Sequence, residues 1–282
     1  MISQGLIESR ELKPGIKECR LNLAQLFDDE EQRRRFDERW PAFYEADPQN
    51  GDIFRKKPNE LTYLTEEFIP SRVDERPPLL LILGNPASHS VASGFCFAFE
   101  GKGREHRFWR SLNKVGLLRF SSDSEFPEYA WQEQIEVRKR ELFDLSYESP
   151  FRIGISLYFT IPSPASGSKW AGISGLENLF GRKGLRRIEV EGRNRIGNLI
   201  RKFLNPGCGV IAFQKDAYEG IRSSQGPEYN RTMALEGALS TKVSLDGFDF
   251  WLFGVPPTRL AYSKQFQDVL SGIMEKLLNI RS

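Results

Sequence analysis

The sequence predicts a three-layer α/β/α domain with a central, mostly parallel four-stranded sheet, preceded by an N-terminal helical extension. Two observations lead to this prediction. Four short apolar runs after residue 76 have the length and composition of buried strands. Polar breaks and helical periodicities separate these runs, which favours parallel strands joined by helical crossovers.

The first 76 residues are expected to be helices joined by polar breaks, and the main domain is expected to span 77–282. An acidic stretch at 28–31 precedes a basic stretch at 33–35. Acid followed by base suits the dipole of a helix. We favour a solvated helix face for this charge run over contact of Arg33–Arg35 with nucleic acid.

The first strand is expected at Leu79–Leu83, an apolar run short enough to be buried on both faces. It stops at Gly84 and Pro86, which leaves the amide of Asn85 at the carboxyl end of the strand. A loop of small residues and closely spaced aromatic residues follows. Such a polar tip after a buried strand is where α/β sheets place their binding sites.

Three further strands are expected downstream, at Phe151–Ile161, Val210–Phe213 and Phe248–Phe253. The loop after the first of these contains Pro162 and Ser163, and the loop after the last contains Val255 and Pro256. Because parallel strands end at the same edge of a sheet, these loops should meet the Asn85 loop there.

The densest basic cluster lies between residues 182 and 202, on an expected amphipathic helix. Arg182 and Lys183 lie beside glycines at 181 and 184, and we expect a flexible loop there. Both are candidates for gripping DNA phosphates, a contact that positions a protein without reading sequence. An ordinary solvated helix face is the alternative interpretation.

Composition limits the function classes. The formal net charge is +2, so binding to a polyanion must come from local clustering. Three scattered cysteines suit a reducing cytoplasm and are too few for an iron–sulfur cluster, which usually takes four thiolates. The two histidines lack partners at metal-ligand spacing. No apolar run approaches the roughly 20 residues that cross a bilayer. We therefore expect a cytoplasmic monomer without metal, cofactor or membrane partner.

The region after Pro77 resembles the uracil-DNA glycosylase superfamily, and most closely its mismatch-specific uracil/thymine branch. The residues that carry the resemblance are Gly84-Asn85-Pro86, then Gly94-Phe95-Cys96-Phe97-Ala98, then Arg107-Phe108-Trp109. The Pro162-Ser163 loop and the Lys215–Glu219 segment match the same branch. The resemblance implies a monofunctional DNA glycosylase, which flips a deaminated or mismatched base out of DNA and hydrolyses its N-glycosidic bond.

The resemblance also implies roles for individual residues. Asn85 would orient the attacking water, with His89 and Ser163 as further catalytic candidates. Phe97 would stack on the extruded base, with Phe95 as the second choice. The remaining implied contacts are Gly84, Pro86, Pro162, Val255 and Pro256 for the substrate, and Arg259 and Leu260, near the position of the residue that wedges into the duplex, for DNA.

Two departures from the family pattern leave an alternative open. Val255 takes the place of a His or Asn that stabilises the departing base in several branches, and Pro257 replaces a serine. The stabilising donors would then be backbone N–H groups of the Pro162 or Val255 loops, or Ser163. The alternative is a glycosylase-like protein that binds nucleic acid or a nucleotide without cleaving it.

Overall fold

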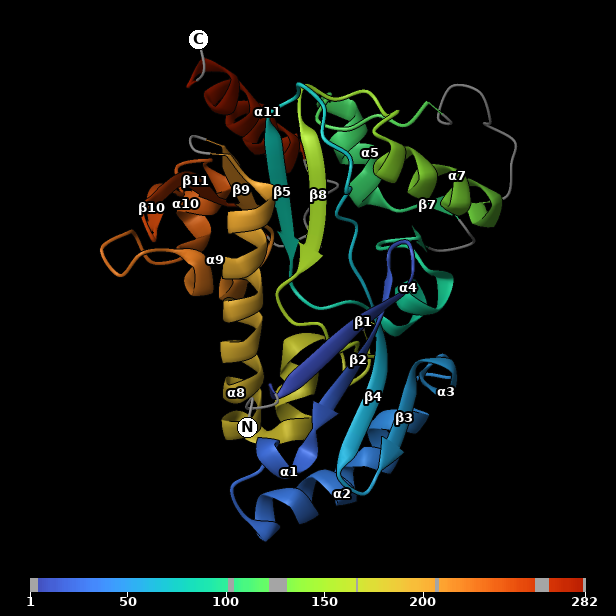
Figure 1. Cartoon of the computed structure of the whole chain (residues 1–282). Helices are drawn as coiled ribbons and strands as arrows, with labels where there is room; N and C mark the ends of the chain where they lie inside the picture. Colours follow the sequence, from blue (N-terminus) through green and yellow to red (C-terminus); the bar gives the residue numbers. More distant parts are fainter. Residues whose placement is uncertain are drawn as a thin grey trace. The chain divides into compact units, whose positions relative to one another are not determined.

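The computed structural model describes residues 5–100, 104–121, 131–165, 167–205, 208–256 and 264–280. The chain divides into two compact units, and Figure 1 labels their helices and strands. The first unit consists of Met1–Glu67, Gly84–Cys96 and Leu157–Asn194. The second consists of Phe68–Leu83, Phe97–Ser156 and Arg195–Ser282. The boundary expected between residues 76 and 77 stays a prediction.

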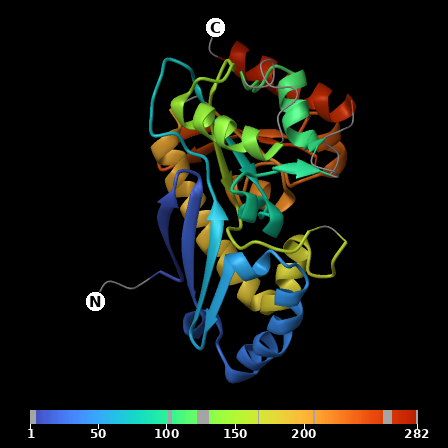
Figure 2. The same cartoon turned by 90° about the vertical axis from the view of Figure 1, so that its right-hand side faces the viewer.

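The first unit contains an antiparallel sheet in the order β1-β2-β4-β3, whose blue and cyan strands lie side by side in Figure 2. Three helices accompany this sheet among the described residues 5–67, and α4 (Ser88–Ser93) lies in the next segment of the unit. The elements of the first 67 residues are β1 (Ile7–Lys13), β2 (Ile16–Asn22), α1 (Leu23–Leu26), α2 (Glu30–Glu45), α3 (Asn50–Ile53), β3 (Phe54–Lys57) and β4 (Glu60–Glu66).

The prediction of a wholly helical N-terminal extension is therefore wrong, although α2 is a helix where one was expected. An antiparallel sheet can leave one face in water, so charged residues interrupt its strands and hide the apolar pattern. In β4 the alternation was present, because Leu61, Tyr63 and Thr65 are buried and the residues between them are not. Gly15, with φ of 84°, makes the turn between β1 and β2.

Aromatic side chains form the core of the first unit. Phe36 of α2 stacks on Phe180 with ring centroids 5.4 Å apart, and Phe43 meets Trp170 edge to face at 6.1 Å. Contacts of this kind add to the stabilisation that comes from burying the rings. The N-terminal residues thus share one core with the segment 157–194.

The second unit contains a five-stranded, mostly parallel sheet in the order β10-β11-β9-β5-β8, so the chain has a mixed α/β fold. β5 and β11 both run parallel to β9, and β10 is antiparallel to β11. Its strands are β5 (Pro78–Leu83), β8 (Arg152–Leu157), β9 (Gly209–Ala212), β10 (Ser240–Leu245) and β11 (Phe248–Gly254). All four predicted strands are confirmed, and the second is shorter than predicted.

The predicted count of four strands is wrong because β10 adds a fifth. A hairpin joins β10 to β11 through Asp246 and Gly247, whose φ angles are 53° and 80°. Asp-Gly is a preferred pair for a two-residue hairpin turn, because both positions need a positive φ. The signal was present in the sequence, but the polar residues of β10 gave it no buried-strand pattern.

The remaining elements of the second unit are short strands and helices. Helix α11 (Lys264–Asn279) packs on β9, and a Cβ placed on Gly209 would come within 2.7 Å of the Leu277 side chain. Helix α8 (Gly172–Phe203) contributes to both units. The other helices and short strands of the second unit are β6 (Phe99–Glu100), β7 (Arg104–Glu105), α5 (Arg107–Lys114), α7 (Trp131–Asp144), α9 (Lys215–Ile221), α10 (Arg231–Leu235) and α11 (Lys264–Asn279).

Helix α8 confirms the basic amphipathic helix that was expected after residue 182. It is kinked at Gly181, whose φ of 73° and ψ of 162° are not helical. The flexible loop expected across residues 181–184 is absent from this described part of α8. Gly184 is buried inside the helix, and a Cβ there would meet Phe180 at 3.3 Å.

Two glycines of α8 give a matched pair of stability predictions. A Cβ on Gly192 would lie 2.4 Å from the backbone oxygen of Tyr158, whereas on Gly197 it would meet only Leu245, at 3.8 Å. Gly192→Ala should lower the free energy of unfolding by about 1–3 kcal/mol through this overlap. Gly197→Ala should raise it by up to about 1 kcal/mol, because alanine is the better helix former. Urea unfolding of both variants tests the pair, and equal effects would contradict the close approach.

Candidate functional site

In the first unit, the loop that follows β5 is tied to the loop that follows β8. The backbone N–H of Ser163 donates to Pro86 O at 3.1 Å, and that of Ser88 donates to Ser163 O at 2.9 Å. Phe159 N–H donates to Gly84 O at 2.9 Å. The predicted residues Gly84, Asn85, Pro86, Pro162 and Ser163 are therefore brought together.

The side chain of Asn85 is held in one orientation. Its Nδ2 donates to Ser163 Oγ at 2.9 Å and to Pro86 O at 3.2 Å. A carbonyl oxygen can only accept, so Pro86 O must face the nitrogen of the amide and not its oxygen. Among the described residues, Oδ1 of Asn85 accepts no hydrogen bond. The amide thus keeps one open acceptor on a half-buried side chain.

Ser163 acts as an acceptor at this point. Its side chain is buried, and Oγ accepts from Asn85 Nδ2 and from Gly172 N–H at 2.8 Å. Both lone pairs of the hydroxyl are then in use. The hydroxyl donates toward Pro164 O, and the 3.5 Å between the two oxygens is long for a hydrogen bond. This geometry positions Asn85 and offers little to a departing base.

His89 lies on α4, next to the Asn85 loop in sequence, and is half-buried. Burial lowers the pKa of its imidazole below the usual value, and the negative charge of Asp47 opposes part of this shift. The neutral form of the ring is therefore favoured at neutral pH. His89 fits the role of a neutral hydrogen-bonding group better than that of a cation.

Asn50 supports the start of α4 and was missed by the sequence analysis. Its fully buried side chain donates through Nδ2 to Phe43 O at 3.0 Å and accepts through Oδ1 from Ser88 Oγ at 2.7 Å. Asn50 falls in one of the polar breaks that were expected between the N-terminal helices. No pattern in that stretch distinguishes a buried Asn from an exposed one.

The aromatic loop after α4 contains two fully buried residues, Phe95 and Cys96, and one half-buried residue, Phe97. Phe95 is fully buried in the first unit and belongs to its core, so it is a poor candidate for stacking on a base. Cys96 is also buried, and burial followed by the nearby Glu66 raises the pKa of its thiol well above the usual range. A thiol held in its neutral form is a weak nucleophile.

Phe97 lies in the second unit and is half-buried. The ring stacks on His106 at 4.7 Å and meets Phe108 at 4.6 Å between centroids. Its φ is 49°, which is unfavourable for a bulky residue. The Trp109 indole N–H donates to Phe97 O at 3.1 Å and helps hold this conformation. Strain of this kind costs about 1–3 kcal/mol and is often found at functional sites.

Val255 and Pro256 are buried at the carboxyl end of β11 in the second unit. Val255 N–H donates to Ala212 O at 3.1 Å, and Tyr229 Oη donates to Val255 O at 3.2 Å. The backbone donor expected here for a departing base is therefore already used, as is that of Ser163. Arg259 and Leu260, together with Pro257, lie outside the described residues.

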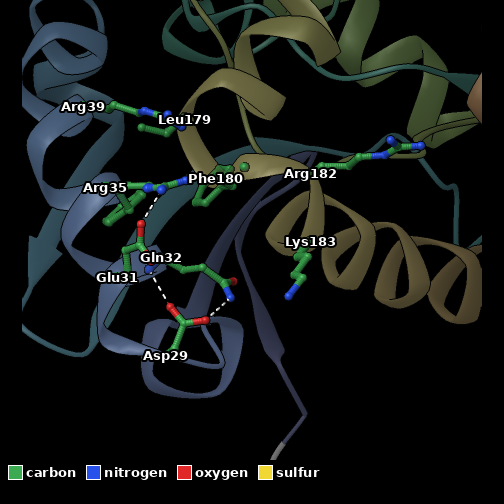
Figure 3. Close-up of a pocket in the computed structure, with 11 residues that line it drawn as sticks. Asp29, Glu31, Gln32, Arg35, Arg39, Leu179, Phe180, Arg182 and Lys183 are labelled. Carbon is green, nitrogen blue, oxygen red and sulfur yellow. Dashed lines mark hydrogen bonds and ion pairs between the residues drawn. The ribbon is translucent and has the colours of Figure 1, made fainter.

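Arg182 and Lys183 line a pocket of the first unit together with residues of α2, shown in Figure 3. Arg182 and Lys183 are far in sequence from the loop that contains Asn85. Over the described ranges, no group of three or more His, Cys, Asp or Glu side chains could hold a metal ion. The same part of the chain contains no helix long and apolar enough to cross a membrane.

Comparison with known proteins adds no family or relative. No protein-family model matches the chain, and no curated protein matches it.

Proposed function

We propose that this protein is a monofunctional DNA glycosylase that flips a deaminated or mismatched base out of DNA and hydrolyses its N-glycosidic bond. The observation that carries the proposal is the fixed amide of Asn85, whose Nδ2 is bound to Ser163 and Pro86 while Oδ1 stays open among the described residues. The motif that resembles the glycosylase superfamily has its Asn at this same position.

The chemistry follows from what an amide can do. Oδ1 accepts a hydrogen bond from a water molecule, which turns a lone pair of that water toward the anomeric carbon of an extruded nucleotide. An amide is too weak a base to take the proton early. The bond to the base therefore breaks largely before the water adds, and the base leaves as an anion. The water then forms the new bond to the anomeric carbon and loses one proton to solvent, and the base anion takes up one proton. Ser163 serves as a positioning residue in this scheme, because it fixes the amide that holds the water.

Phe97 supports the second part of the proposal, which is binding of the extruded base. A nucleobase can stack on an aromatic ring whatever its hydrogen-bonding edge, and such stacking is worth about 1–3 kcal/mol per base. The positive φ of Phe97 and its half-buried side chain fit a residue whose ring is held in one position, against His106 and Phe108. Phe95 does not take this role because it is fully buried.

The proposal is tested with labelled duplexes that carry uracil, a thymine·guanine mismatch or hypoxanthine at one position. Incubation with the protein followed by alkali should cut at least one of these strands at the lesion, because alkali cleaves abasic sites. The undamaged duplex should stay intact. Folded protein that binds these duplexes and produces no abasic site in any of them would overturn the proposal.

A second candidate is a protein that binds nucleic acid or a nucleotide without cleaving it. The observation that favours it is the absence of a free donor at two expected places, since the N–H groups of Ser163 and Val255 are both used within the protein. An oxyanion site elsewhere loses about 2.7–4 kcal/mol of transition-state stabilisation when one donor is removed. Under this candidate the protein binds DNA with no base release under any condition.

A further inference from the structure

Three exposed cations lie within the first turn and a half of α8 after its kink. Arg182, Lys183 and Arg186 are exposed, and none of them makes a hydrogen bond or ion pair with the described residues. Neighbouring arginines differ in this respect. Each of the following has a carboxylate partner: Arg33 with Asp37, Arg34 with Glu38, Arg35 with Glu31, and Arg187 with Asp28.

The spacing of these cations costs the helix some stability. Arg182 and Arg186 are four residues apart, so they lie on the same side of the helix. Like charges at this spacing destabilise a helix by about 0.2–0.5 kcal/mol. An anion that contacts both arginines would remove this repulsion. Arg33, Arg34 and Arg35 of α2 are paired with carboxylates, whereas Arg182, Lys183 and Arg186 are not, so positive charge is available at this turn of α8.

A pocket of about 350 Å³ opens beside this turn, between α2 and the kink at Gly181. Figure 3 shows Lys183 pointing into the gap toward the amide of Gln32, while Arg182 extends outward. The two carboxylates in the pocket are already engaged. Asp29 accepts from the backbone and side-chain nitrogens of Gln32 at 2.8 and 2.6 Å, and Glu31 pairs with Arg35.

The negative charge of Asp29 is also stabilised by its neighbours in the pocket. Hydrogen bonds from Gln32, and then the charge of Lys183, lower the pKa of this carboxyl below its usual value. Asp29 therefore stays ionised and serves as the N-terminal cap of α2. Arg182 and Lys183 of α8 also line the pocket, and neither makes a hydrogen bond with the described residues.

We propose that Arg182 and Lys183, which line this pocket, and Arg186, one turn further along α8, form a phosphate-contact surface that holds the backbone of a nucleic-acid duplex. The choice of duplex DNA as the partner rests on the proposed function, whereas the surface itself rests on its unpaired charges. Contacts to phosphates give affinity that is independent of base sequence. Anionic membranes are commonly bound by clusters of about 4–8 basic residues, which is more than this turn supplies.

The test measures the affinity for an undamaged duplex by fluorescence anisotropy over a range of salt concentrations. Each phosphate contact contributes about 0.9 to the slope of log affinity against log salt. The double variant Arg182→Gln with Arg186→Gln should therefore lower the magnitude of this slope by about 1.8. Glutamine keeps the helix-forming tendency and removes only the charges.

The control variant is Arg55→Gln with Lys57→Gln, which removes two exposed charges from β3, outside the pocket. It should leave the slope close to that of the natural protein. The proposal is overturned if the two variants change the slope equally, if neither changes it, or if the Arg182/Arg186 variant loses binding to phosphatidylserine vesicles and keeps its DNA slope. Because the duplex carries no lesion, failure of base release leaves this result unaffected.

Discussion

Replacement of Asn85 by alanine is expected to lower the single-turnover rate of base release at least roughly 100-fold, because the water loses the group that orients it. The affinity for lesion-containing DNA should change by no more than about twofold, since the amide contributes to the reaction and not to uniform binding. In the folded protein the amide donates hydrogen bonds to Ser163 Oγ and Pro86 O, and both are lost in this variant. The measurement is the rate with enzyme in excess over DNA.

The matched control for this variant is Asn194→Ala. Asn194 is an exposed asparagine on α8 in the same unit as Asn85. Its replacement should leave both rate and affinity unchanged. If Asn85→Ala releases the base as fast as the natural protein, the role given to this amide is wrong.

The second large effect concerns stability and involves Glu66, at the end of β4. Its side chain is buried with only 3% exposed, and Oε2 has no hydrogen-bond partner among the described residues. Burial raises the pKa of the carboxyl from 4.5 to about 8. Below pH 4.5 the group is protonated in both the folded and unfolded states, so it adds no pH dependence to the stability there.

Between pH 4.5 and about 8 the folded protein keeps a proton that the unfolded chain has lost. The free energy of unfolding must therefore fall as the pH rises through this window, by up to roughly 5 kcal/mol in total. The amide of Glu66→Gln does not titrate, so the free energy of unfolding of this variant should not fall in this way. Its stability relative to the natural protein should rise across the window and level off above about pH 8.

Urea unfolding at several pH values from 4.5 to about 9 measures this effect. Glu11→Gln, an exposed change on β1, is the control and should follow the natural protein at every pH. Parallel pH profiles for the natural protein and Glu66→Gln would contradict a buried, neutral Glu66.

The sequence allowed the buried parts of the fold to be predicted better than the solvated ones. Leu79–Leu83 is a continuous apolar run, and a strand buried on both faces requires such a run. The strands of the N-terminal sheet have one solvated face, so lysine, arginine and glutamate occur within them. Their sequences therefore resemble that of a charged, solvated helix. Only their alternation with buried residues, as in β4, could have revealed them.

The candidate site shows the same division. Asn85 was predicted from its place after a buried strand, and its local pattern was enough to single it out. Asn50 was missed because its importance depends on a hydrogen bond to Ser88, which is distant in the sequence. The occupied N–H groups of Ser163 and Val255 depend on partners that no local pattern names. Hydrogen bonds across the chain thus decide which candidates remain available for chemistry.

The most direct test of the account is mass spectrometry of the small molecules released from lesion-containing duplexes, with bound DNA quantified in the same samples. The account predicts a free base from the natural protein, and none above background from Asn85→Ala at equal DNA occupancy. Equal occupancy with no free base from the natural protein, for every lesion tested, would contradict it.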